Sequence, residues 1–315
     1  MTTGIDCSKD SLDYSVISGE KRIGYGKVSN NKKGFETLLK HIKDSHVVME
    51  ATGPYSVPLA LFLAKNDVKV SVVNPLVIKR FSQMRLSRAK TDRKDALMIA
   101  QYGQTEKPDL WKPPSALTFQ LQQLEAYLEM LKKMMLCNQL HAFKSSGVLL
   151  KDLDEELQEQ IHGFERKIKE KEKEINQLIN QEYKDLMNNL TSIPRIGKRS
   201  ATLMIINTRG FQDFQSHKQL ISYFGLSPQI FESGTSVKGK AKICKMGMSQ
   251  VRKTLYMDAL SAILYNKACK GLYDRLRANG KHTRVALIAV VNKMIKQAFA
   301  IAKSNRPYQV DYVRI

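Results

Sequence analysis

The stretch Gly4-Ile5-Asp6-Cys7-Ser8-Lys9 closes the first β-prone run of the chain and places an acid at its end. Further β-prone and helical runs follow, separated by turn residues such as Ser18-Gly19-Glu20. The expected strands are 3–7, 13–17, 21–28, 46–50 and 69–73, and the expected helices are 32–43, 55–65, one starting at 75, and 92–102. Three consecutive strands followed by alternating helices and strands predict an α/β domain with a mixed sheet and flanking helices.

Four carboxylates in this region are candidate metal ligands. Asp6 and Glu50 lie at or near the ends of strand-like runs, and Asp92 and Asp95 lie at i and i+3, on one face of a helix. Acids that converge in this way suit a hard divalent cation such as Mg²⁺, with Mn²⁺ as a substitute. A two-metal site for phosphoryl transfer, with ions roughly 4 Å apart, needs such a cluster. The plainer interpretation is that Asp92 and Asp95 only favour the positive end of their helix.

Basic residues surround the last two acids. Acids inside a basic stretch indicate metal ligands flanked by side chains that bind phosphate. The candidate phosphate contacts here are Arg85, Arg88, Lys90, Arg93 and Lys94.

Composition points to a polyanionic partner. The 315 residues carry a net charge of +21, and residues 191–315 hold 22 Lys and Arg against five Asp and Glu. Such an imbalance favours nucleic acid over a merely solubilising surface, which usually mixes both signs. The four cysteines are scattered, without a C-x-x-C pair, and no signal peptide or membrane span is expected. We therefore expect a cytoplasmic protein with reduced thiols.

The middle of the chain predicts two long helices. Apolar residues recur at heptad spacing on both sides of a break at Ser145-Ser146-Gly147. They are Leu117, Leu121, Leu124, Leu128, Leu131 and Met135 in the first run, and Leu157, Ile161, Phe164, Ile168, Ile175 and Leu178 in the second. The two helices either form an antiparallel hairpin or pair with another subunit. We expect three domains: an α/β domain at 1–110, a helical coiled-coil arm at 111–190 and a basic, mostly helical domain at 191–315.

The basic domain begins with a turn of the form Pro194-x-x-Gly197 between two expected helices. Such a turn resembles a helix-hairpin-helix, which presents backbone N–H groups and basic side chains to a phosphate. The plainer interpretation is a helix that starts after a turn. The candidate nucleic-acid contacts of this domain are Arg195, Lys198, Arg199, Lys238, Lys240, Lys242, Lys245 and Arg252.

Several motifs together resemble the DEDD transposases, insertion-sequence recombinases related to the Piv-type DNA invertases. The matching N-terminal motifs are Gly4-Ile5-Asp6-Cys7-Ser8-Lys9, Glu50-Ala51-Thr52-Gly53 and Thr91-Asp92-Arg93-Lys94-Asp95-Ala96. The matching C-terminal motifs are Ile193-Pro194-x-Ile196-Gly197, Tyr223-Phe224-Gly225-Leu226-x-Pro228, Ser233-Gly234 and Lys245-Met246-Gly247. One departure is Arg195, which stands where the family usually has glycine.

The resemblance implies a RuvC-like, RNase H-type N-terminal domain in which Asp6, Glu50, Asp92 and Asp95 bind Mg²⁺. It also implies that Ser233 attacks DNA and forms a covalent phosphoserine link, with Ser236 as the alternative nucleophile. A structured guide (bridge) RNA is a further implied partner. Strand exchange needs at least two active sites held together, so a homo-oligomer, a dimer or tetramer, is expected on the nucleoid.

Three other functions fit parts of the sequence. A junction nuclease of the Holliday type would use the acids alone and hydrolyse with water. A non-catalytic nucleic-acid-binding assembly protein would carry a degenerate site. A tyrosine recombinase would use residue types found near the C-terminus, but it has no use for four N-terminal acids; its candidates are His282, Arg284, Arg306, Tyr308 and Tyr312.

Overall fold

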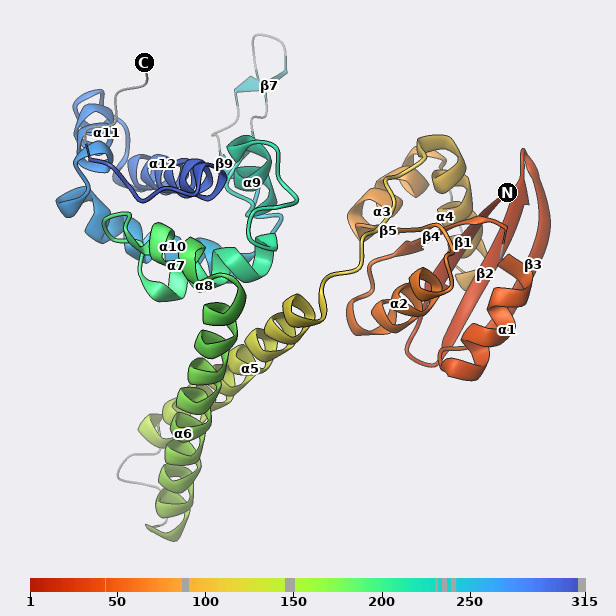
Figure 1. The fold of residues 1–315 in the computed structure, drawn as a ribbon, viewed down its shortest axis with the longest axis horizontal. Helices are drawn as coiled ribbons and strands as arrows, with labels where there is room; N and C mark the ends of the chain where they lie inside the picture. The colour runs from red at the N-terminus through yellow and green to blue at the C-terminus, as the bar shows by residue number, and fades with distance from the viewer. Residues whose placement is uncertain are drawn as a thin grey trace. The chain divides into compact units, whose positions relative to one another are not determined.

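The computed structural model describes residues 1–42, 44–86, 91–144, 151–229, 232–233, 237–238 and 242–310. The chain divides into two compact units, Met1–Pro113 and Pro114–Ile315 (Figure 1). The division falls close to the boundary expected at 110, and it groups the two long helices with the C-terminal region.

The first unit is built on a five-stranded sheet in the order β3-β2-β1-β4-β5. Strands β1, β2 and β3 pair antiparallel, whereas β1, β4 and β5 pair parallel. The strands are β1 (Thr2–Cys7), β2 (Ser11–Ser18), β3 (Lys21–Ser29), β4 (His46–Glu50) and β5 (Val70–Val73). The helices are α1 (Lys32–Ile42), the short 3₁₀ turn η1 (Gly53–Tyr55), α2 (Val57–Lys65), α3 (Pro75–Met84) and α4 (Asp92–Glu106). The mixed sheet with flanking helices is therefore confirmed.

Alternation along the strands separates two faces of this sheet. Ile5, Leu12 and Met49 are fully buried and form one core together with Leu38 of α1 and Leu63 of α2. Because side chains alternate along a strand, Gly4, Asp6 and Val48 belong to the other face. Helix α4 covers this second face, so the acids at the strand ends lie on the same side as α4.

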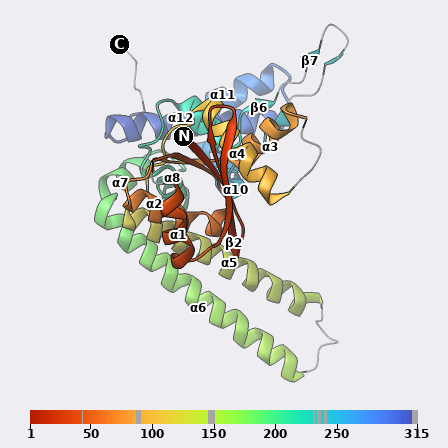
Figure 2. The same ribbon diagram turned by 90° about the vertical axis from the view of Figure 1, so that its right-hand side faces the viewer.

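The second unit begins with two long helices, α5 (Ala116–Lys144) and α6 (Lys151–Glu182), which run side by side in Figures 1 and 2. They are antiparallel, because Lys132 pairs with Glu172 at 2.7 Å and Asn138 with Gln160 at 2.9 Å. Seven of the predicted heptad positions are buried: Leu121, Leu128, Leu131, Leu157, Ile161, Ile168 and Ile175; Thr118, Glu125 and Ile179, which were not predicted, are buried as well.

A helical bundle and two short two-stranded sheets, β6-β9 and β7-β8, complete the second unit. The helices are α7 (Lys184–Thr191), α8 (Lys198–Thr208), α9 (His217–Tyr223), α10 (Ser249–Tyr265), α11 (Lys267–Ala278) and α12 (Thr283–Ser304). The strands are β6 (Pro228–Gln229), β7 (Glu232–Ser233), β8 (Val237–Lys238) and β9 (Lys242–Ile243). Helix α12 alone among the described helices is long and apolar enough to cross a membrane, yet Val290, Met294 and Ala298 pack in the bundle core.

Candidate active site

Asp6 and Glu50 end two neighbouring parallel strands. In the β1–β4 register Gly4 lies opposite Val48 and Ile5 opposite Met49, so Asp6 and Glu50 follow at the same edge of the sheet. Both side chains are half-buried and point to the face covered by α4. The parallel pairing of β1 with β4 therefore brings these two acids to one edge.

Helix α4 approaches the sheet closely because glycines line the contact. A Cβ on Gly4 would overlap the backbone of Ala96 and Ala100, and a Cβ on Gly103 would overlap the side chain of Val48. This contact fixes how α4 lies across β1 and β4, with its N-terminal turn at the edge that carries Asp6. The close packing thus delivers the first turn of α4 to the two strand-end acids.

The first turn of α4 carries the other two acids. Thr91 caps the helix, since its side chain accepts a hydrogen bond from the Lys94 N–H at 3.3 Å. Asp92 and Asp95 follow in the first turn, at the positive end of the helix. Four candidate acids, Asp6 among them, therefore converge on one edge of the sheet from three elements.

Burial and the neighbouring acids change the pKa of Asp6. Burial and the charges of Asp95, Asp92, Glu50 and Asp13 raise the pKa of the Asp6 carboxyl from 3.8 to about 6. A carboxyl in this position ionises at a free-energy cost unless a cation offsets the neighbouring charges. The electrostatics of the site therefore favour a bound cation.

The donor set fits a divalent metal in charge and chemistry. All four acids offer oxygen ligands, which hard cations prefer. Within the described ranges, no group of three or more His, Cys, Asp or Glu side chains is placed so that it could hold a metal ion. Lys27 instead lies with its Nζ 3.8 Å from Asp92. Metal binding would therefore draw the carboxylates together and away from this lysine.

Asp13 and Lys27 are site residues that sequence reasoning missed. Asp13 lies directly opposite Asp6 in the β1–β2 register and is only 3% exposed. Tyr25 donates its hydroxyl to Asp13 Oδ1 at 2.6 Å, and Lys27 Nζ lies 3.1 Å from Oδ2. The side-chain alternation of the predicted hairpin could have revealed Asp13, because that alternation puts it on the face of Asp6.

The basic residues predicted around the acids contact different groups. The Arg93 guanidinium stacks over the Tyr25 ring at 4.9 Å, and that of Arg85 over Phe81 at 5.3 Å. Lys94 lies in the first turn of α4 with its side chain exposed. Arg88 and Lys90 lie outside the described residues. Arg93 thus lies over the ring of Tyr25, whose hydroxyl donates a hydrogen bond to Asp13.

The candidate nucleophile belongs to the second unit. Ser233 lies in β7 and pairs with Val237 of β8, next to the connection 234–236. Lys238 and Lys242 lie in β8 and β9. Ser236 and Lys240 lie outside the described residues. Ser233 and Lys238 thus belong to the two-stranded sheet of β7 and β8, whereas Lys242 belongs to that of β6 and β9.

Some of the remaining predicted nucleic-acid contacts already bind other groups of the protein, and others do not. Arg199 pairs with the buried Glu125 and lies 3.1 Å from Glu129, so it links α8 to α5. Arg252 donates to the Phe224 carbonyl at 2.8 Å. Lys198 and Lys245 are exposed. These contacts make Arg199 and Arg252 part of the packing of this unit, whereas the two lysines face solvent.

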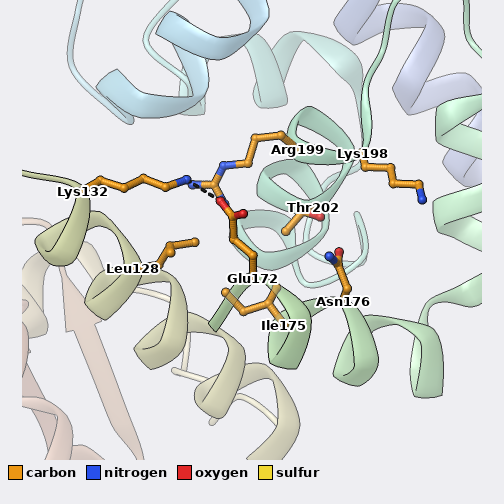
Figure 3. Close-up of a pocket in the computed structure, with 8 residues that line it drawn as sticks. All are labelled: Leu128, Lys132, Glu172, Ile175, Asn176, Lys198, Arg199 and Thr202. Atoms are coloured by element: carbon orange, nitrogen blue, oxygen red, sulfur yellow. Dashed lines mark hydrogen bonds and ion pairs between the residues drawn. The ribbon is translucent and has the colours of Figure 1, made fainter. Parts of the chain in front are cut away.

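A cavity of about 250 Å³ lies beside Arg199, between α5, α6 and α8 (Figure 3). Lys132 and Glu172 meet across it at 2.7 Å. The lining residues are Leu128, Lys132, Glu172, Ile175, Asn176, Lys198, Arg199 and Thr202. Lys132 pairs with Glu172, and Arg199 pairs with Glu125 and Glu129 beside the cavity, which is typical of a network that joins helices.

The C-terminal residues considered for a tyrosine recombinase have structural partners. His282 caps α12, because its Nδ1 accepts from the Arg284 N–H at 3.2 Å. The Tyr308 hydroxyl lies 3.4 Å from Gln297 Nε2. Tyr312 lies outside the described residues. His282 and Tyr308 are thus tied into the ends of the bundle.

Comparisons with known proteins match both units. The DEDD transposase model of the IS110 type, described as a transposase, matches residues 3–143, and the model described as the transposase IS116/IS110/IS902 family matches residues 187–274. Pilin gene-inverting proteins of Moraxella bovis and Moraxella lacunata are each 29% identical over 316 residues, which is 97% of this chain and 96% of each relative. An uncharacterized 43.6 kDa protein of insertion element IS110 from Streptomyces coelicolor is 30% identical over 120 residues, which is 38% of this chain and 29% of that protein.

The mixed sheet, its edge of acids and these matches define the class of the protein, a DNA recombinase or transposase. The N-terminal sheet is consistent with the RuvC-like fold expected of DEDD enzymes, for which a divalent metal is the common cofactor. Because the two units match two models of one group, the chain belongs to the IS110 family of transposases.

Proposed function

We propose that this transposase cleaves and exchanges DNA strands in a Mg²⁺-dependent reaction with Ser233 as the nucleophile. The observation that carries the proposal is the convergence of Asp6, Glu50, Asp92 and Asp95 on one sheet edge. The raised pKa of Asp6 supports it, because the cluster is most stable when a cation offsets its charge.

Each part of the site has a separate task in this proposal. The four acids hold the cation, which when bound supplies Lewis-acid stabilisation of charge on the scissile phosphate. The Ser233 hydroxyl loses its proton to solvent and forms a bond to phosphorus, while the bond from phosphorus to the leaving deoxyribose oxygen breaks. The resulting phosphoserine conserves the energy of the broken bond for rejoining to a second strand.

Supporting features come from the rest of the chain and from the relatives. The Moraxella relatives are named for inverting a pilin gene, and we extend rearrangement of DNA to this chain. The excess of 22 Lys and Arg over five Asp and Glu in residues 191–315 suits DNA and a structured guide RNA. The turn at Pro194–Gly197 would act as a helix-hairpin-helix contact with phosphates.

We further propose that α5 and α6 form a coiled-coil arm for assembly. Two strand breaks must be held together during exchange, so a dimer or tetramer is the working form. The arm, at 111–190, would then separate a catalytic domain at 1–110 from a serine domain at 191–315.

A trapping experiment tests this function. The full chain is mixed with a nicked suicide DNA and Mg²⁺, and protein bound covalently to DNA is measured after denaturation. The adduct should form with the wild type and be lost in Ser233→Ala, Asp6→Asn and Glu50→Gln. The exposed turn residue Asp10 gives a matched control, Asp10→Asn, which should retain the adduct.

The other functions predict different results in the same assay. Cleavage that survives Ser233→Ala but needs Asp6 identifies a nuclease that hydrolyses with water. Binding without cleavage under any of these conditions identifies a non-catalytic assembly protein. Adduct formation that is unchanged by both Asp6→Asn and Glu50→Gln contradicts the metal site.

A further inference from the structure

Arg195 holds an unusual backbone conformation in the turn between α7 and α8. Its φ is +73°, in the left-handed region that disfavours any residue with a Cβ. The preceding Pro194 is fixed, since the fully buried Asn266 points its Nδ2 at the Pro194 carbonyl at 3.5 Å. Asn266 also caps α11 by accepting from the Cys269 N–H at 3.2 Å. The turn is therefore anchored at the junction of α10 and α11, with Arg195 at its exposed tip.

The Arg195 side chain lies over an exposed aromatic ring. Its guanidinium carbon is 3.5 Å from the centroid of the Tyr265 ring, and the Tyr265 side chain is 62% exposed. Within the part of the chain that the structure describes, no carboxylate pairs with Arg195. Arg199, four residues on, is by contrast bound to Glu125 and Glu129. The stack at Arg195 thus contributes little to the core, although its backbone is strained.

The geometry of this stack defines what can bind to it. The guanidinium carbon lies 3.5 Å from the centre of the tyrosine ring, and both residues are exposed. A planar cation on a ring is a stacking surface for a nucleobase. Both faces of a base inside a duplex are covered by its neighbours, so only an unpaired or displaced base can lie on it. Lys198, exposed in the first turn of α8, is placed to neutralise an adjoining phosphate.

We propose that Arg195 and Tyr265 form a stacking platform for an unpaired base of DNA or RNA. The proposal deepens the proposed function, because it rests on nucleic acid being the substrate, but it does not depend on the metal site or on Ser233. Tyr265 then supports the guanidinium of Arg195, and Arg195 contacts a base in addition to a phosphate.

Fluorescence of 2-aminopurine measures the platform directly. The full chain, without divalent metal, is titrated into a single-stranded DNA, the matching RNA and the matching duplex, each carrying the probe. Wild-type protein should quench the probe in the single strands and bind the duplex without such quenching. Tyr265→Ala should weaken single-strand binding about tenfold, as expected for the loss of one stacked base. Tyr265→Phe, which keeps the ring, should bind within about twofold of wild type.

Two further variants separate stacking from charge and from stability. Arg195→Lys keeps the charge but removes the plane, so it should lose the quenching. Arg195→Gly should also lose it while its Tm stays at or above that of the wild type, because glycine relieves the left-handed backbone. A merely structural arginine would instead lower the Tm when removed. The matched control is Leu264→Ala, since this neighbour is 65% exposed but carries no ring.

The outcomes distinguish this inference from the proposed function. Equal losses on single strands and duplex in Tyr265→Ala, or no loss on either, overturn the platform. If the protein quenches the probe only in the DNA, or only in the RNA, that strand supplies the base; either result supports the platform. Asp6→Asn should quench like the wild type. A chain that fails to cut DNA but still quenches through Tyr265 refutes the proposed function and keeps the platform.

Discussion

Replacing Asp6 by asparagine should stabilise the metal-free N-terminal unit while abolishing its response to Mg²⁺. The pKa of Asp6 rises from 3.8 to about 6 on folding, through burial and the four neighbouring acids. The folded state therefore holds a proton that the unfolded state has lost, and stability falls as pH rises from about 4 to about 6. The full shift corresponds to about 3 kcal/mol. Because Asp6 is only half-buried, solvent screening reduces the expected gain for Asp6→Asn to about 1–2 kcal/mol above pH 7, with no gain near pH 4.

The assay uses the single tryptophan of the chain, Trp111, which packs against the core of the first unit. Urea unfolding followed by its fluorescence reports this unit alone. Without metal, Asp6→Asn should exceed the wild type in stability at pH 7.5, whereas Asp10→Asn should match it. Mg²⁺ at 100 times its Kd should add about 2.7 kcal/mol to the wild type and nothing to Asp6→Asn. A metal-free Asp6→Asn that is less stable than the wild type at pH 7.5, or equal Mg²⁺ responses, refutes the reasoning.

Three further changes test the packing around the two units. Gly103→Ala should cost about 1–3 kcal/mol in urea unfolding and weaken the Mg²⁺ response, because the new methyl group pushes α4 off the sheet. Gly24→Ala is its control in the same unit; its new Cβ would lie 3.6 Å from the Val16 side chain, an ordinary contact, so the urea midpoint should change little. Asp13→Asn should cost about 1–3 kcal/mol by the same Trp111 assay, since a neutral amide replaces the buried carboxylate and no longer forms the ion pair with Lys27, and an unchanged midpoint would contradict this. Glu125→Gln should lower the Tm of the second unit, measured by circular dichroism, because Arg199 is left partly unpaired; an unchanged Tm would make this pair energetically unimportant.

Local pattern was enough to predict the mixed sheet with flanking helices and to identify four acids as candidates for its site. Once the strands are paired, the alternation of side chains along each strand shows on which face of the sheet its acid lies. The spacing i and i+3 places the other two acids on one face of their helix. Asp13 was missed because its role depends on which residue lies opposite it, and a single strand does not reveal its partner. The same register argument, applied to the first hairpin, would have paired Asp13 with Asp6.

The basic domain was harder to predict because charge alone does not say what a cation contacts. Arg199 and Arg195 stand four residues apart in one basic motif, yet Arg199 is engaged by Glu125, 74 residues away in the chain. Arg195 is instead paired with the ring of Tyr265, at the far end of α10. Such partners are set by the packing of helices distant in sequence, so composition predicts a nucleic-acid surface without indicating which residues form it.

Iron-mediated cleavage of the polypeptide tests most directly whether the four acids hold a metal ion. Fe²⁺ replaces Mg²⁺ in the full chain, ascorbate and peroxide are added, and the cuts in the backbone are mapped by mass spectrometry. If the four acids hold the ion, the backbone is cut near residues 6, 50 and 92–95. Excess Mg²⁺ should suppress these cuts, and they should be absent in Asp6→Asn. Cuts confined to other segments, or a pattern unchanged in Asp6→Asn, would contradict metal binding by these acids.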